Sequence, residues 1–271
     1  MVCIAIETSS KIYFQKYKKH KLKRDNIMNN AALSLDLMIK TQLETCAMQN
    51  EKILSALEEV DRTKFVPTKF SNAAYIDGDI PLCNERSLMA VLPFTQLIEA
   101  SEVKPTDNVM IVGCNLGYSS AVMAQLANHI TAVENHPELV SKARKNLCGI
   151  NKKIEVVTSP LTVGCQTHAP YDVIIVEGAV EIIPDNLQKQ LAEGGRLVTI
   201  QSISKRAGTN HCMGKILTIR KQGDKYIKQL GNDISGTILS GLRKKQNSLC
   251  KLIFNLKYFI NIHKILFSSN N

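Results

Sequence analysis

The chain has 271 residues, 44% of them hydrophobic, which allows one sizeable domain with a buried core and argues against wholesale disorder. Its net charge of +10 is carried by its two ends: residues 1–27 hold seven Lys or Arg against two acids, and residues 242–271 hold six and no acid. The stretch between them is close to neutral. A nucleic-acid-binding face gathers its basic residues on the folded domain, so we expect no nucleic-acid partner.

Cysteine spacing and hydropathy exclude further classes of protein and of binding site. The eight cysteines are scattered, with no C-x-x-C pair and no Cys/His cluster at zinc spacing. Lys or Glu interrupts every apolar run before it reaches the length of a membrane span. We therefore expect a reduced, cytoplasmic protein with no metal site and no membrane span, and we expect it to be a monomer.

The two basic ends are predicted to lie outside the domain. Residues 1–27 are polar and weakly patterned, which indicates a disordered or non-native tail before a domain over 28–241. Residues 242–271 form a basic C-terminal extension. Its apolar residues between 249 and 260 could line one face of a membrane-surface helix, but its composition favours a disordered or non-native extension.

The first half of the domain is predicted to be helical. Apolar residues recur at helical intervals from Leu33 to Val60, which indicates two helices broken near Gln49 and Asn50. Pro67 ends the second helical region, because the residue before a proline is pushed toward extended conformations. Residues 75–86 are rich in turn formers, and a further helix is expected over 88–100.

From residue 109 onward, strands and helices alternate. The pattern predicts strands over 109–112, 130–133, 154–157, 173–176 and 196–200, with helices over 119–126, 137–147 and 187–192. A hairpin over 216–220 and 226–228 follows, turning at Gly223 and Asp224. The fold class is therefore α/β: a doubly wound, mostly parallel, Rossmann-like sheet with an N-terminal helical segment and a C-terminal antiparallel hairpin.

The first strand leads into the turn Val112-Gly113-Cys114-Asn115-Leu116-Gly117-Tyr118. An apolar strand, two glycines and a helix are typical of a nucleotide-like ligand site, because glycine lets the backbone approach the ligand. Glu134 ends the next strand, 21 residues beyond Gly113, where a carboxylate can accept both ribose hydroxyls. The alternatives are a tight turn without a ligand and a solvated glutamate at a strand end.

The composition of the turn favours one class of cofactor. A nicotinamide dehydrogenase would show a three-glycine turn to place a pyrophosphate, whereas this chain has Asn115 and Leu116 between its two glycines. S-adenosyl-L-methionine carries no phosphate and needs fewer glycines. The pattern therefore favours S-adenosyl-L-methionine and leaves an oxidoreductase as a distant alternative.

Over residues 28–222 the chain resembles the protein-L-isoaspartate O-methyltransferase family. The resemblance rests on these stretches, in this order: Phe65-Val66-Pro67, Ala74-Tyr75, Ile80-Pro81-Leu82, Lys104-Pro105, the glycine turn, Val133-Glu134, the strand over 169–176 and Leu191-Ala192-Glu193-Gly194-Gly195-Arg196-Leu197-Val198. It implies a methyltransferase fold and methyl transfer from S-adenosyl-L-methionine to the α-carboxylate of isoaspartyl residues, a step in protein repair. It also implies a protein or peptide substrate.

The resemblance assigns candidate residues to each side of the site. The residues implied to bind the cofactor are Gly113, Cys114, Asn115, Gly117, Tyr118, Glu134, Ser159 and Glu177. On the substrate side, where the family carries a hydroxyl residue, this chain has Met89, and the nearby candidates are Arg86 and Ser87. Met89 cannot donate a hydrogen bond to a carboxylate, and Arg86 could replace that contact as a bidentate clamp. No catalytic residue is assigned beyond these.

Other departures from the family pattern are Ile111 and Ser159, which stand where the family has acids, and Glu177, which stands where it has a small or hydroxyl residue. Two residues of the turn have two possible roles each. The Cys114 thiol could be activated by the helix N-terminus, although a packed, inert cysteine is the commoner case. Tyr118 could cover the cofactor or only the helix.

The leading hypothesis is a carboxyl methyltransferase with a divergent substrate pocket, and the alternative is a catalytically inactive cofactor-binding paralogue that acts through protein contacts.

Overall fold

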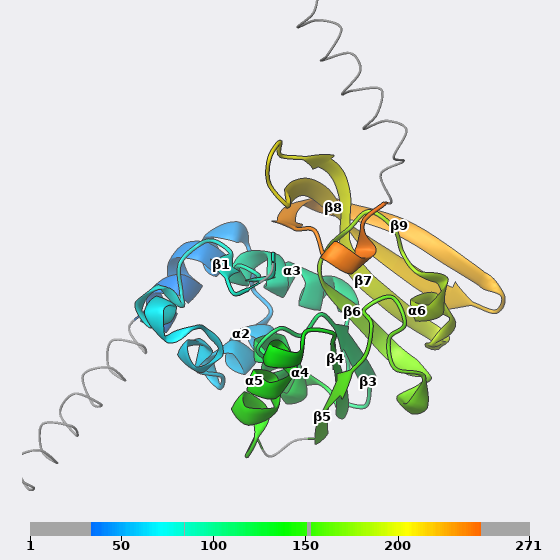
Figure 1. Ribbon diagram of the computed structural model, residues 1–271, viewed down its shortest axis with the longest axis horizontal. Helices are drawn as coiled ribbons and strands as arrows, with labels where there is room; N and C mark the ends of the chain where they lie inside the picture. The colour runs from blue at the N-terminus through cyan, green and yellow to red at the C-terminus, as the bar shows by residue number, and fades with distance from the viewer. Residues whose placement is uncertain (1–33, 84, 151–152, 245–271) are drawn as a thin grey trace, which may run out of the picture.

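The computed structural model describes residues 34–83, 85–150 and 153–244 (Figure 1). Its helical part comes first in the chain. Residues 34–38 are helical and continue into η1 (Ile39–Leu43) and η2 (Glu44–Cys46). The helix α2 (Glu51–Glu58) begins at Asn50, whose side chain accepts a hydrogen bond from the Ile53 amide. The break predicted near Gln49 and Asn50 is confirmed, because this cap starts a new helix.

Short elements lead from α2 toward the sheet. The turns η3 (Arg62–Phe65) and η4 (Thr68–Ala73) flank Pro67. A small antiparallel ribbon follows, formed by β1 (Ile80–Pro81) and β2 (Ser87–Leu88). The helix α3 (Val91–Ser101) comes next and overlaps most of the helix expected over 88–100. The ribbon matters for the site because it carries Arg86 and Ser87.

A seven-stranded sheet in the order β5-β4-β3-β6-β7-β8-β9 forms the centre of the domain. Its strands are β3 (Asn108–Val112), β4 (His129–Glu134), β5 (Lys153–Thr158), β6 (Tyr171–Val180), β7 (Leu191–Lys205), β8 (His211–Gln222) and β9 (Lys225–Thr237). The first five pair in parallel, and β8 and β9 pair antiparallel. The predicted fold class is confirmed, with a hairpin longer than expected.

The two faces of the sheet have separate hydrophobic cores. Val109 and Ile111 point to one face, where they pack with α2, α3, α4 (Tyr118–Leu126) and α5 (Pro137–Leu147). Met110 and Val112 point to the other face, which the helix α6 (Asp185–Lys189) and the turn η6 (Ser240–Leu242) help to cover (Figure 1). Strands buried on both faces are continuous apolar runs, as these are.

One predicted border was wrong. The expected helix over 187–192 ends at Lys189, and Leu191 already belongs to β7. Gly194 and Gly195 do not stop a helix but lie within β7, at an irregularity where the pairing with β6 shifts between Tyr171 and Val173. The same glycine pair is compatible with a helix stop or a strand bulge, and only the register with β6 distinguishes them.

The two basic terminal segments, residues 1–27 and 242–271, lie mostly outside the described residues. The domain boundaries at 27 and 241 therefore stay predictions, as does the amphipathic helix beyond 249. Leu242, one residue past the expected domain end, is fully buried, and its carbonyl accepts hydrogen bonds from the amides of Glu181 and Ile182. Within the described residues no helix is long and apolar enough to cross a membrane. The six cysteines in these ranges are all free thiols.

Candidate active site

The glycine turn lies at the carboxyl ends of the parallel strands. Strands β3 and β6 are neighbours although β4 and β5 come between them in the chain, so this is the switch point where ligands bind in sheets of this kind. Gly113 and Gly117 adopt φ values of 84° and 95°, and the Gly113 amide donates to the carbonyl of Val133 at 2.9 Å. Asn115, at φ 54°, takes the left-handed conformation that asparagine tolerates.

Glu134 faces this turn from the end of β4. Its side chain has no exposed surface and accepts five hydrogen bonds. Three come from backbone amides, those of Asn115 at 3.0 Å, Asn135 at 2.9 Å and His136 at 3.1 Å. The other two come from the guanidinium of Arg86, at 2.9 and 2.8 Å. The carboxylate expected to meet the ribose is therefore held by a bidentate ion pair.

Arg86 reaches Glu134 from the loop between β1 and β2. Its guanidinium also donates to the side-chain oxygen of Asn115 at 2.8 Å. The amide nitrogen of Asn115 donates in turn to the Ser87 carbonyl at 3.2 Å. Glu85, which precedes Arg86 in the chain, pairs instead with Arg243 at 3.0 Å. The substrate-side loop and the cofactor turn are thus one connected network.

Glu177 lies on the other side of the turn. It occupies an irregular stretch of β6, where the pairing with β7 shifts between Ile175 and Ala179. Its carboxylate accepts a hydrogen bond from the hydroxyl of Ser119, in the first turn of α4. Burial raises the pKa of Glu177 to about 7, and the Ser119 hydrogen bond and the charge of Arg86 oppose this rise.

The segment after β9 closes the space in front of the turn. The amide of Leu239 donates to the Ala179 carbonyl at 3.0 Å, and its side chain lies beside Gly113, which follows β3, and Gly178 of β6. A Cβ atom added to Gly178 would lie 2.7 Å from the side chain of Leu239. One added to Gly113 would lie 3.4 Å from Leu239 and 3.2 Å from the Arg86 guanidinium. A cavity of about 10 Å³ remains between these groups.

Some of the remaining predicted site residues line this cavity, and others lie outside it. Met89 and Ser87 line the cavity, and the backbone carbonyl of Met89 accepts from the buried guanidinium of Arg62 at 2.7 Å. Ser159 follows β5, and its amide donates to the Glu134 carbonyl at 3.1 Å. Ile111 is buried on the helical face of the sheet.

Two residues of the turn point into the core. The ring of Tyr118 packs against those of Phe65 and Phe94, with the Arg62 guanidinium 4.5 Å from its centre, so it is part of the hydrophobic core. Cys114 is fully buried, and burial raises the pKa of its thiol. An activated Cys114 thiol is therefore contradicted, because burial and the nearby carboxylates of Glu134 and Glu177 raise its pKa.

The backbone of the site fits S-adenosyl-L-methionine, and the side chains as described do not. The glycine turn and the fully buried carboxylate of Glu134 are the elements that a nucleoside needs. However, Arg86 takes both oxygens of that carboxylate, and Leu239 packs against Gly113. Pockets for drug-sized ligands measure about 300–1,000 Å³, far more than the cavity of about 10 Å³ between these groups.

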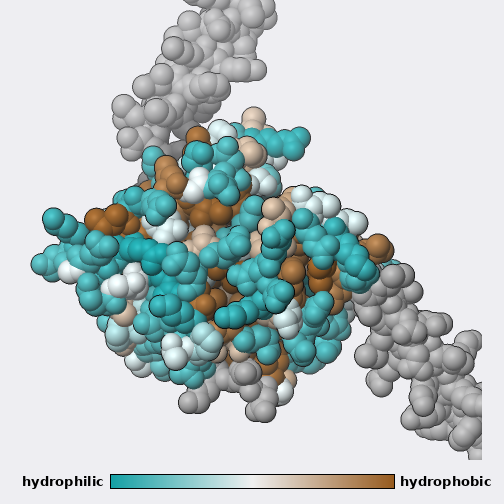
Figure 2. All heavy atoms as spheres, turned by 180° about the vertical axis from the view of Figure 1, so that it is seen from behind, coloured by the Kyte–Doolittle hydropathy of each residue, from teal (hydrophilic) through white to brown (hydrophobic). Residues whose placement is uncertain are grey.

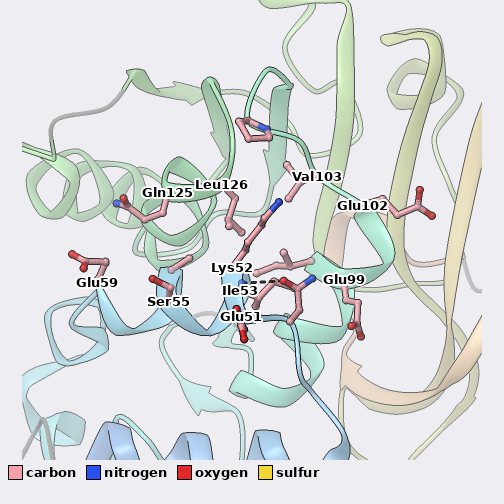
Figure 3. A pocket seen from close by; sticks show the side chains of 14 residues that line it. Glu51, Lys52, Ile53, Ser55, Glu59, Glu99, Glu102, Val103, Gln125 and Leu126 are labelled. Carbon is pink, nitrogen blue, oxygen red and sulfur yellow. Dashed lines mark hydrogen bonds between the residues drawn. The ribbon is translucent and has the colours of Figure 1, made fainter.

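A larger cleft, of about 460 Å³, lies beside the loop that leads into β3 (Figure 3). It is bounded by α2, by the C-terminal ends of α3 and α4, and by the loop before β3. Glu51, Glu59, Glu99 and Glu102 surround it, and Lys52 extends across it. Its lining contains no residue of the glycine turn.

From behind, the described domain is mostly hydrophilic with scattered hydrophobic patches (Figure 2).

Among the described residues no group of three or more His, Cys, Asp or Glu is arranged to hold a metal ion. Sequence reasoning missed Leu239 and Asp79, which line the same cavity as Arg86. No local pattern marks either residue, because each reaches the site through a contact distant in the chain.

Comparison with known proteins identifies a family. The model of the protein-L-isoaspartate(D-aspartate) O-methyltransferase family matches residues 34–230. A protein-L-isoaspartate O-methyltransferase of Koribacter versatilis is 34% identical over 168 residues, covering 62% of this chain and 76% of that protein. One of Methanoculleus marisnigri is 31% identical over 188 residues, covering 69% and 82%.

Solved structures agree in fold. A protein-L-isoaspartate O-methyltransferase of Plasmodium falciparum, crystallised with S-adenosyl-L-homocysteine, superposes with a TM-score of 0.61 at 18% identity, covering 78% of this chain and 98% of that one. Another structure of that name gives a TM-score of 0.62 at 18% identity, covering 78% and 66%. At this identity the likeness establishes the fold.

Proposed function

Because this chain belongs to the protein-L-isoaspartate(D-aspartate) O-methyltransferase family, we propose that it is a protein carboxyl methyltransferase that uses S-adenosyl-L-methionine to methylate isoaspartyl carboxylates. The observation that carries the proposal is the fully buried Glu134 carboxylate facing the Gly113 turn at the sheet's switch point. A buried carboxylate beside a glycine turn is suited to the two hydroxyls of a ribose.

The residues of the chain would divide the work by position. The Gly113–Gly117 turn and Glu134 would hold the cofactor, which supplies an electrophilic methyl group on a sulfonium. The substrate carboxylate is itself the nucleophile, so the site needs alignment rather than a general base. Arg86, once away from Glu134, is a bidentate donor that could bind this carboxylate.

Glu177 tunes the same space electrostatically. An ionised Glu177 would repel a substrate carboxylate, whereas its protonated form would not. Its pKa of about 7 leaves a substantial neutral fraction near neutral pH. The carboxylate that interrupts the family pattern is therefore compatible with an anionic substrate.

The direct test is methyl transfer to a peptide that contains one L-isoaspartyl residue. The full-length protein is incubated with S-adenosyl-L-methionine and the peptide, and the methyl ester is measured by mass spectrometry. A matched peptide with ordinary aspartate at the same position is the control. We expect ester on the isoaspartyl peptide only. Equal or absent methylation of both peptides contradicts the proposal.

The second candidate is a cofactor-binding paralogue without turnover. One observation favours it: position 89 on the substrate side carries Met89, whose side chain cannot donate a hydrogen bond to a substrate carboxylate. This candidate predicts calorimetric binding of S-adenosyl-L-homocysteine together with no methylation of the isoaspartyl peptide. A cytoplasmic location and a monomeric state remain predictions from composition.

A further inference from the structure

Two side chains from distant parts of the chain fill the space where the cofactor is expected. Arg86 comes from the loop between β1 and β2, and Leu239 comes from the segment after β9. We propose that Arg86 and residues 237–243 form an intramolecular plug that leaves the cofactor site when S-adenosyl-L-methionine binds. This inference rests on the proposed function and adds a closed state to it.

Hydrogen-bond capacity provides the first argument. A carboxylate offers about four lone-pair positions, and Glu134 already accepts five hydrogen bonds. The three backbone donors belong to the turn and to the strand end, so they are part of the cradle. The two bonds from Arg86 are the ones that ribose hydroxyls can replace. Cofactor binding and the Arg86–Glu134 pair therefore exclude each other.

Volume provides the second, independent argument. Leu239 packs beside Gly113, which follows β3, and close enough to Gly178 of β6 that a Cβ atom there would meet it at 2.7 Å. The remaining cavity of about 10 Å³ is at the lower limit of the space that holds a single water molecule, about 10–15 Å³. Moving Arg86 alone would therefore leave Leu239 at the switch point.

The two halves of the plug are joined at its rim. The hydroxyl of Thr237 donates to Asp79 at 2.7 Å, and Arg243 pairs with Glu85 at 3.0 Å. Asp79 and Glu85 belong to the segment that carries Arg86, whereas Thr237 and Arg243 flank Leu239. These contacts couple the two segments, so they are expected to open together. The Arg243–Glu85 pair is partly exposed and adds only a modest bias toward the closed state.

Calorimetric titration of S-adenosyl-L-homocysteine into the full-length protein tests the plug. We expect Leu239→Ala to bind at least 10-fold more tightly than wild type, because the ligand no longer competes with the leucine side chain. Arg243→Ala, which changes only the rim, is expected to bind about 3-fold more tightly. Arg220→Ala is the matched control, because it also removes an arginine paired with a glutamate, here Glu102 at 2.7 Å, from a strand whose residues do not line the cavity.

Amide hydrogen exchange on the wild-type protein adds a readout that needs no variant. The amides of Leu239 and Leu242 are hydrogen-bonded, to the carbonyls of Ala179 and Leu239. Saturating S-adenosyl-L-homocysteine is expected to speed their exchange, while the amides of β3 and β4 become better protected. Slower or unchanged exchange at 239 and 242 overturns the plug.

The outcomes separate the two claims. If wild type binds the ligand and neither Leu239→Ala nor Arg243→Ala binds it more tightly, the plug is wrong and the proposed function stands. If no form of the protein binds the ligand, including Leu239→Ala, both are wrong. Thermal unfolding of each variant before titration establishes that it is folded.

Discussion

The buried carboxyl group of Glu177 makes the free energy of unfolding depend on pH, and a single substitution at this position removes that dependence. Its pKa rises from 4.5 to about 7 on folding, mainly because burial disfavours the charged form. Between these two values the folded state binds more protons than the unfolded state, so stability falls as pH rises. With about 1.4 kcal/mol per pKa unit, the loss between pH 5 and pH 8 is about 2–3 kcal/mol.

Glu177→Gln should remove this loss while keeping a group that can bond to Ser119. We expect urea unfolding, measured at pH 5, 6, 7 and 8, to show the wild type losing about 2–3 kcal/mol relative to the variant across that range. At an m-value of about 2 kcal/mol/M, this corresponds to a relative midpoint shift of about 1 M. Glu58→Gln, on the exposed face of α2, is the control. A difference that stays constant with pH would show that Glu177 does not take up a proton on folding in this range.

Three further predictions follow from buried groups. Arg62→Lys, which loses the fork that donates to two backbone carbonyls at 2.8 and 2.7 Å, should lower the free energy of unfolding by about 2–4 kcal/mol in urea titrations, and a loss below about 0.5 kcal/mol would contradict this. Glu134→Ala should cost about 3–5 kcal/mol by the same assay, because it strands the buried Arg86, and adding Arg86→Met should recover part of it; no recovery would argue against the pair. Native iodoacetamide labelling at pH 8 should modify exposed Cys46 well before Cys114, and equal rates would contradict the burial of Cys114.

The sheet could be predicted because its strands are buried on both faces and read as apolar runs. The helix over 137–147 was predicted to the residue, since Pro137 marks its first turn and its apolar face is periodic. The border near Leu191 failed for a physical reason. A bulge that begins β7 uses the same glycines as a helix stop, and the difference lies in pairing with β6, which no local window contains.

The candidate site likewise has a part that the sequence predicts and a part that it does not. The glycine turn and Glu134 could be predicted because both stand at the ends of neighbouring strands, where residues meet at one edge of the sheet. The Arg86–Glu134 pair spans 48 positions, and Leu239 meets Gly113 from the far end of the chain. Such contacts follow from the packing of the whole chain. Arg86 was singled out from the sequence as a carboxylate clamp, and the carboxylate that it holds in the structure is that of Glu134.

The most direct test of the proposed cofactor site measures whether the Glu134 carboxylate contributes to binding the cofactor. Because removing Glu134 also releases Arg86, the comparison is made between Arg86→Met and the double variant Arg86→Met/Glu134→Ala, each titrated with S-adenosyl-L-homocysteine in a calorimeter. We expect the double variant to bind more weakly by about 1–3 kcal/mol, the loss expected for a charge-assisted hydrogen bond. Equal affinity of the two variants would contradict the proposed cofactor site.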